Sequence, residues 1–107
     1  MNNAGSPVAL ITGSGRRRVG NVIARDLADR GYAIALHYHS SEREALESRE
    51  EIRATGVDCE AYQANVASAA EVDQMVTKVQ DKFGRLDVLV AAAAITQSLM
   101  ESGVQIA

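Results

Sequence analysis

The sequence contains a single cysteine, Cys59, and no long hydrophobic run. One cysteine excludes an internal disulfide, and no Cys and His residues stand at zinc-ligand spacing, so we expect no metal and a reducing compartment. No apolar stretch reaches the roughly 18 residues of a membrane helix, and residues 1–7 lack a basic segment followed by an apolar one. These absences predict a cytoplasmic protein that does not bind a membrane.

Positive charge is scarce as well. The chain has 11 Lys and Arg residues against 14 Asp and Glu residues, which gives a formal net charge of -3. Because nucleic acids bind basic surfaces, this balance argues against a nucleic-acid partner, and the only dense basic run is Arg16 to Arg18. The 107 residues, of which 47% are hydrophobic and 23% charged, fit one small globular domain.

Short apolar runs alternate along the chain with stretches of helical periodicity. Apolar runs bounded by glycine or proline are typical of strands buried on both faces, and apolar residues that recur every three or four positions are typical of helices. Strict alternation with short connections favours right-handed crossovers and therefore a parallel α/β sheet. The predicted strands are Val8–Thr12, Ala33–Tyr38, Cys59–Ala64 and Leu86–Ile95, and the predicted helices run from Gly20 to Gly31, Ser41 to Gly56 and Ser68 to Gly84.

The starts of the second and third predicted helices share a capping-box spacing. Ser41 is followed three residues later by Glu44, and Ser68 by Glu71. In such a box the serine and the acid each satisfy a backbone N–H group that has no partner within the helix. The spacing predicts helices that begin at these serines.

Three glycines, Gly13, Gly15 and Gly20, lie between the first predicted strand and the first predicted helix. Glycine at such a turn lets backbone N–H groups and the helix N-terminus approach a phosphate, which a side chain would hold off. The alternative is a surface turn with a helix cap. The strand–turn–helix context favours the phosphate site.

The end of the second predicted strand discriminates between dinucleotides. A carboxylate there accepts a hydrogen bond from a free ribose 2′-hydroxyl and repels a 2′-phosphate. The first acid in this chain is Glu42, which lies beyond His39, Ser40 and Ser41. These side chains, with a guanidinium from the glycine loop, favour a phosphate dianion, so we expect NADP rather than NAD, with Arg18 as the basic ligand. A flavodoxin-like FMN domain shares the alternation but fits these groups less well.

Other side chains that could carry chemistry have simpler interpretations. His37 and His39 lie two apart on one strand face, but no third metal ligand is in sight, so a structural role is expected. Cys59 is expected to be a small buried hydrophobic residue.

Four motifs, "ALITGSGRRRVG", "ALHYHSS", "QANV" and "FGRLDVLVAAAAI", carry a resemblance to a known family. From about Pro7 to Ile95 the sequence resembles the N-terminal half of the short-chain dehydrogenase/reductase family, and within it the pteridine reductases and related NADPH-dependent carbonyl reductases. The resemblance implies an incomplete Rossmann-type three-layer α/β fold over residues 1–95, with four parallel strands in the order 3-2-1-4. Residues 96–107 form a tail without assignable structure.

The resemblance also implies a site for the dinucleotide. Asn65 stands where the family usually has Asp, the run Ala91 to Ala94 stands where it has Asn-Asn-Ala-Gly, and the glycine loop is one residue longer than usual. The implied lining residues are Thr12, Gly13, Ser14, Gly15, Val19 and Gly20 at the pyrophosphate, Arg18, His39, Ser40 and Ser41 at the 2′-phosphate, Asn65 and Val66 at the adenine, and Ala92 and Ala93 nearer the nicotinamide.

The family reduces carbonyls with a Tyr-x-x-x-Lys pair and an upstream Ser. The residues four positions after the three tyrosines are Leu36, Glu42 and Val66, so this chain contains no such pair and no catalytic residue is assigned. We therefore expect a truncated NADP-binding portion of an enzyme that transfers hydride from NADPH to a carbonyl or pterin-like substrate, inactive alone. The alternatives are a non-catalytic nucleotide-binding or interaction module that forms a homo-oligomer or covers its fourth strand with a partner, and an enzyme completed by a second chain.

Overall fold

The computed structural model describes residues 5–15 and 19–91. Predictions that concern Arg16 to Arg18, Ala92, Ala93 and the tail at residues 96–107 lie outside the described residues, as does the side chain of Val19. Strands and helices alternate as expected along the described segments. They are β1 (Val8–Ile11), α1 (Val19–Asp29), β2 (Ala33–Tyr38), α2 (Glu42–Arg53), β3 (Cys59–Gln63), α3 (Ala69–Phe83) and β4 (Val88–Val90).

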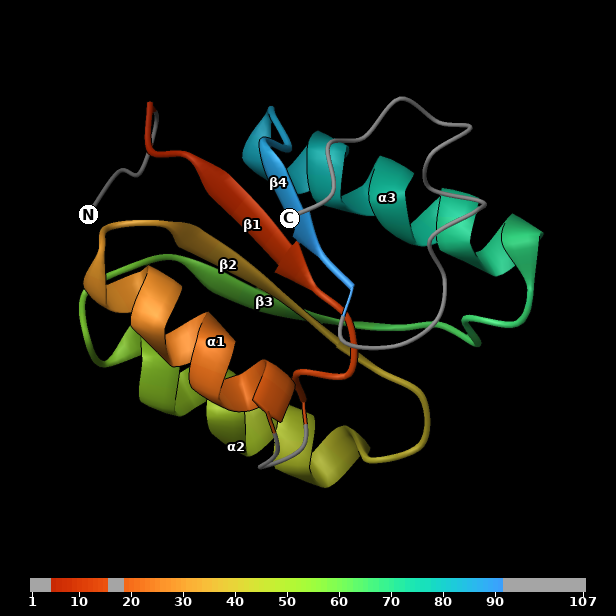
Figure 1. The fold of residues 1–107 in the computed structure, drawn as a ribbon, viewed down its shortest axis with the longest axis horizontal. Coiled ribbons are helices and arrows are strands. Elements are labelled where there is room, and N and C mark those ends of the chain that lie inside the picture. Colours follow the sequence, from red (N-terminus) through yellow and green to blue (C-terminus); the bar gives the residue numbers. More distant parts are fainter. Residues whose placement is uncertain (1–4, 16–18, 92–107) are drawn as a thin grey trace.

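The strands form one parallel sheet in the order β3-β2-β1-β4, which confirms the predicted Rossmann-type topology. Ile11 pairs with Leu36 of β2 on one side and with Val90 of β4 on the other. Helices α1 and α2 lie on one face of the sheet and α3 on the opposite face (Figure 1). The central strand β1 is therefore buried along its whole length.

The core consists of two clusters, one on each face of the sheet. Leu10 and Leu89 belong to the cluster with α3, whereas Ile11 and Ile34 belong to the cluster with α1 and α2. Successive residues of a strand point to opposite faces, so a sheet covered on both faces needs apolar residues at consecutive positions. This is why β1 reads as a continuous apolar run rather than as an alternating pattern.

The two predicted capping boxes have different outcomes. At α3 the Ser68 hydroxyl accepts from the Glu71 N–H at 3.3 Å, although the Glu71 carboxylate reaches back to the Asn65 N–H at 3.0 Å instead of to Ser68. At α2 the box predicted for Ser41 and Glu44 is wrong, because the Ser41 side chain makes no capping hydrogen bond. Ser41 has φ -98° and ψ 56°, outside the extended region typical of N-caps.

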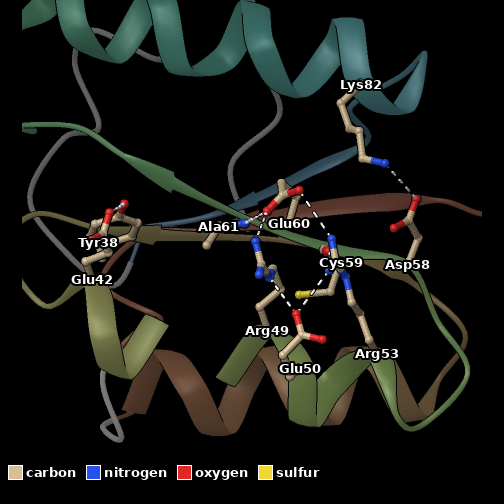
Figure 2. Close-up of polar contacts among 10 residues, drawn as sticks. All are labelled: Tyr38, Glu42, Arg49, Glu50, Arg53, Asp58, Cys59, Glu60, Ala61 and Lys82. Atoms are coloured by element: carbon tan, nitrogen blue, oxygen red, sulfur yellow. Dashed lines mark hydrogen bonds and ion pairs between the residues drawn. The ribbon is translucent and has the colours of Figure 1, made fainter. Parts of the chain in front are cut away.

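Ion pairs join α2 to β3 on the protein surface. Arg49 and Arg53 of α2 both bond to the Glu60 carboxylate, at 2.9 and 3.2 Å, and Arg53 also donates to the Cys59 carbonyl (Figure 2). The Cys59 side chain is fully buried, and this burial raises the pKa of its thiol to about 12. The expected role of Cys59 as a small buried hydrophobic residue is confirmed.

In the segments that the structure describes, no helix combines the length and the apolar character that crossing a membrane requires.

Candidate functional site

The glycine turn follows β1 at the edge of the sheet where the strands have their carboxyl ends. From β1 the chain crosses to β2 on one side, and β4 later joins on the other side, so the turn lies where the strand order reverses. Such a reversal leaves a crevice at which α/β proteins bind ligands. The buried Thr12 donates its N–H to the Val90 carbonyl at 3.0 Å, and Gly13 then adopts a φ of +68° that starts the turn.

His37, near the end of β2, holds this turn through three hydrogen bonds and makes a fourth to the segment after β3. Its ring Nδ1 accepts from the Gly13 N–H at 2.9 Å, and its carbonyl accepts from the Gly15 N–H at 3.0 Å. Its own N–H donates to the Ser14 hydroxyl at 3.2 Å. Since Nδ1 accepts, the ring proton resides on Nε2, which lies 2.9 Å from the Ala64 carbonyl beyond β3 and donates to it. One side chain therefore joins the ends of β1, β2 and β3.

The environment of His37 keeps its ring neutral. The side chain is buried, and this burial lowers the pKa of His37 below 6.5, assisted by the charge of the neighbouring His39. The structural role expected for His37 is therefore confirmed, although the sequence did not reveal its partners. Because the Gly13 and Gly15 N–H groups donate to His37, a phosphate at this turn would instead meet the first-turn N–H groups of α1.

The turn and α1 are in close contact at Gly20. A Cβ atom added to Gly20 would lie 3.0 Å from the Gly13 carbonyl oxygen and 3.1 Å from the Ser14 Cα. A Cβ added to Gly15 would lie 2.8 Å from the Cβ of Ala45 in α2. A side chain at Gly15 would therefore collide with α2, and one at Gly20 would force the turn to give by a few tenths of an ångström.

A second polar link ties the turn to the interface between α1 and α2. The buried Asn21 amide donates to the Ser14 carbonyl at 2.8 Å and to the Ser48 hydroxyl at 3.0 Å. Ser48, also buried, donates to the Gly15 carbonyl at 3.4 Å, and Arg25 donates to the Asn21 side-chain oxygen at 2.7 Å. Sequence reasoning missed both Asn21 and Ser48. The available signal was a polar residue on the buried side of each amphipathic helix.

We expect Asn21→Ala to lower the free energy of unfolding by about 2–3 kcal/mol, because it leaves the buried Ser14 carbonyl and Ser48 hydroxyl with fewer partners. Ser48→Ala should cost less, because Asn21 keeps its bond to Ser14. Chemical denaturation of the two single variants and the double variant measures the coupling between the side chains. Additive changes in the free energy would show that Asn21 and Ser48 do not act together.

The proposed 2′-phosphate ligands follow β2, whose His37 carbonyl accepts from the Gly15 N–H of the turn at 3.0 Å. His39 and Ser40 are exposed, and Ser41 is half-buried with a hydroxyl that caps no helix. The first acid, Glu42, accepts a hydrogen bond from the Tyr38 hydroxyl at 3.3 Å (Figure 2). This bond directs the Glu42 carboxylate toward Tyr38. His39, Ser40 and Ser41 therefore offer donor groups, and the first carboxylate after them, that of Glu42, lies against Tyr38 at the end of β2.

The proposed adenine residues follow β3. The Asn65 side-chain oxygen accepts from the Ala67 N–H at 3.0 Å, which leaves one of its two lone pairs for another donor. Val66 is half-buried and packs against the apolar cluster on the α3 face. Both residues extend from the carboxyl edge that also carries the glycine turn, since β3 is parallel to β1 in the same sheet.

A glycine turn between the first strand and the first helix, at the reversal of strand order in a parallel sheet, is typical of nucleotide-binding α/β proteins. The short chain dehydrogenase family model matches residues 7–106, and the chain belongs to this family.

Curated relatives and solved structures agree with this family. Over 89 residues the chain is 49% identical to the 3-oxoacyl-acyl-carrier-protein reductase FabG of Staphylococcus aureus, covering 83% of this chain and 36% of the relative. The corresponding Synechocystis reductase is 43% identical over 93 residues, covering 87% and 37%. A Burkholderia cenocepacia protein crystallised with bound NADP superposes with a TM-score of 0.75 and 35% identity, covering 80% of this chain and 33% of that one.

The chain thus spans about a third of the length of the relatives that it matches. The family expected from the motifs is confirmed, but the expected subgroup needs correction. The similarity is to 3-oxoacyl reductases rather than to the pteridine reductases. The "ALHYHSS" motif covers only one strand end and suggested the wrong subgroup.

Proposed function

We propose that this chain is the NADP(H)-binding portion of a short-chain reductase. The proposal depends on the arrangement around the glycine turn. The turn packs against the start of α1. The side chains that follow β2 are donors, and the first acid after them bonds to Tyr38. The homologous Burkholderia cenocepacia protein with bound NADP supports the same class of cofactor.

The chemistry of the described residues fits this dinucleotide. The pyrophosphate would lie against the turn and the start of α1, the 2′-phosphate beside the end of β2, and the adenine over the segment after β3. Donor side chains suit a phosphate dianion, and the half-buried Val66 offers an apolar contact to a base. The residues proposed to line the site are Thr12, Gly13, Ser14, Gly15, Val19 and Gly20 around the pyrophosphate, Arg18, His39, Ser40 and Ser41 around the 2′-phosphate, Asn65 and Val66 at the adenine, and Ala92 and Ala93 at the nicotinamide half.

When bound, the cofactor supplies a hydride for a carbonyl substrate. The chain's own residues would bind and orient the adenosine diphosphate half, with the turn fixed by His37 and Asn21. The names of the relatives favour a 3-oxoacyl thioester as the substrate of the whole protein. The proton donor would have to come from outside this sequence, because no Tyr-x-x-x-Lys occurs within it.

Calorimetric titration of the 107-residue chain with NADP, NAD and FMN tests this proposal. We expect NADP to bind more tightly than NAD, and FMN not to bind. We also expect the chain alone to show no carbonyl reduction when assayed beside the Staphylococcus aureus reductase. Tighter binding of FMN would contradict the nucleotide assignment, and turnover comparable to that of the relative would contradict the lack of a proton donor.

A second candidate function, a non-catalytic module that assembles with a partner, is favoured by the position of β4. Among the described strands, β4 pairs only with β1, and its other edge has no neighbour in the sheet order. An unpaired strand edge can bind another chain. Light scattering should then show association that grows with concentration, whereas a monomer at high concentration would argue against this candidate.

A further inference from the structure

His37 occupies a position from which its protonation state can control the glycine turn. Its Nδ1 is the acceptor for the Gly13 N–H at 2.9 Å, while Nε2 donates to the Ala64 carbonyl at 2.9 Å. A protonated ring carries hydrogen on both nitrogens, so Nδ1 could no longer accept. The Gly13 N–H and the new Nδ1–H would then face each other as two donors. We expect the turn to move, because two donors facing each other at this partly buried contact repel and neither bonds to the other.

Two opposing effects act on the charge of the ring: burial, the larger, disfavours protonation and lowers the pKa of His37, whereas the hydrogen bond to the Ala64 carbonyl favours it. Residues 5–15, which contain β1 and the turn, include no titratable side chain. Next to His37 in sequence lie two titratable groups, Tyr38 at the end of β2 and His39 just beyond it, and the charge of His39 opposes protonation of His37. On β3 the paired residue is Tyr62, whose pKa burial raises, so its hydroxyl stays neutral. From α3 the Glu71 carboxylate is engaged by the Asn65 N–H.

We propose that His37 is a positioning residue for the dinucleotide, whose neutral ring sets the glycine turn and whose protonation releases the turn and weakens nucleotide binding. This inference rests on the proposed function of the site. It assigns to His37 a role through Gly13 and not a contact with the ligand. A fixed turn keeps the start of α1 in the place where it meets the phosphates, since Gly20 packs directly on Gly13.

Acid should also reduce stability through the same residue. Burial lowers the pKa of His37 in the folded chain below its usual 6.5, so the unfolded chain binds the proton more readily. The contribution of His37 to the free energy of unfolding is therefore fully present above pH 6.5 and is lost as the pH falls below that value.

Nuclear magnetic resonance of the chain without nucleotide tests the first step. At pH 7.5 we expect 15N shifts of a neutral ring with the proton on Nε2, and slow hydrogen exchange at the Gly13 amide. On acidification, protonation of His37 should coincide with loss of Gly13 protection after correction for the intrinsic pH dependence of exchange. A Gly13 amide that stays protected while His37 becomes protonated would overturn the proposal.

Calorimetry with NAD and NADP at pH 7.5 and 5.5 tests the second step, with His37→Asn as the matched variant. An asparagine amide oxygen can accept the Gly13 N–H in place of Nδ1, and it does not titrate. Because protonation removes one hydrogen bond, we expect wild-type affinity to fall more than that of the variant as the pH decreases, by about threefold to tenfold once His37 is protonated. The comparison includes NAD because the 2′-phosphate of NADP itself titrates near pH 6. NAD lacks this group, so a pH effect on its binding does not come from the phosphate.

Each result has a definite meaning. Equal pH dependence in wild type and His37→Asn for both nucleotides would overturn the role of His37, even if both proteins bind well. Failure of the wild type to bind either nucleotide at pH 7.5 would contradict the proposed function, and with it any role of His37 in affinity. If His37→Asn does not fold, the exchange measurements on the wild-type chain still decide the first step.

Discussion

Replacement of His39 by aspartate is expected to change the nucleotide preference of the chain from NADP toward NAD. His39 is exposed beyond the end of β2, so neither the fold nor the core opposes the change. A carboxylate there repels a 2′-phosphate and accepts a hydrogen bond from a free 2′-hydroxyl. Unit charges about 4 Å apart near a protein surface interact by roughly 1–4 kcal/mol, so NADP affinity should fall by about tenfold or more. Calorimetry with both nucleotides measures the change.

His39→Asn is the matched control, because asparagine has the shape of aspartate without its charge. Both variants lose the imidazole, and any difference between them is due to the carboxylate. We expect the asparagine variant to retain its preference for NADP, with a smaller loss of affinity. Equal NADP affinity in the two variants would show that the 2′-phosphate does not lie beside His39.

The strands and helices were predictable because their patterns are local. Ala33–Tyr38 forms β2 with the predicted bounds, since four consecutive apolar residues followed by two aromatic rings, buried on both faces, leave little ambiguity. The bounds of the fourth strand were harder to predict. Of the predicted run from Leu86 to Ile95, the structure describes the part up to Ala91, and within that part Val88–Val90 pairs with Ala9 to Ile11 of β1.

Cap geometry and the polar contacts of the turn could not be predicted in the same way. Ser41 has the residue type and spacing of a cap, but capping depends on backbone angles that the sequence does not specify. His37 bonds to Gly13 and Ala64, which are 24 and 27 positions away. Asn21 and Ser48 are separated by 27 positions and meet only because α1 and α2 pack together. Such contacts follow from the tertiary fold rather than from local periodicity.

The position of the glycine motif could be predicted from the sequence, but its contacts could not. Its position between β1 and α1 was evident from the sequence, because the apolar run and the helical periodicity bracket it. The sequence suggested that the N–H groups of the motif face a ligand. In the structure, the N–H groups of Gly13 and Gly15 donate to His37 instead. The glycines are needed mainly for close packing of main chain and Cβ atoms, which only coordinates reveal.

Gly20→Ala adds only one methyl group, but we expect it to have a large effect on nucleotide binding. The new Cβ would lie 3.0 Å from the Gly13 carbonyl oxygen and 3.1 Å from two backbone carbons, so the turn or the first residues of α1 must shift. Alanine favours a helix by up to about 1 kcal/mol over glycine, which partly offsets overpacking worth about 1–3 kcal/mol. Stability should therefore fall by only about 0–2 kcal/mol. Nucleotide affinity should fall more, about tenfold or beyond, because a small displacement at a binding site has a large effect.

Gly84→Ala separates this effect from a general loss of stability. Gly84 ends α3 with a φ of +78°, and nothing lies within 4 Å of an added Cβ, so alanine there is strained without any clash. That strain should cost about 1–2 kcal/mol while nucleotide affinity remains unchanged. Denaturation curves measure stability and calorimetry measures affinity for both variants. If Gly20→Ala binds NADP as well as Gly84→Ala does, the start of α1 does not hold the phosphates.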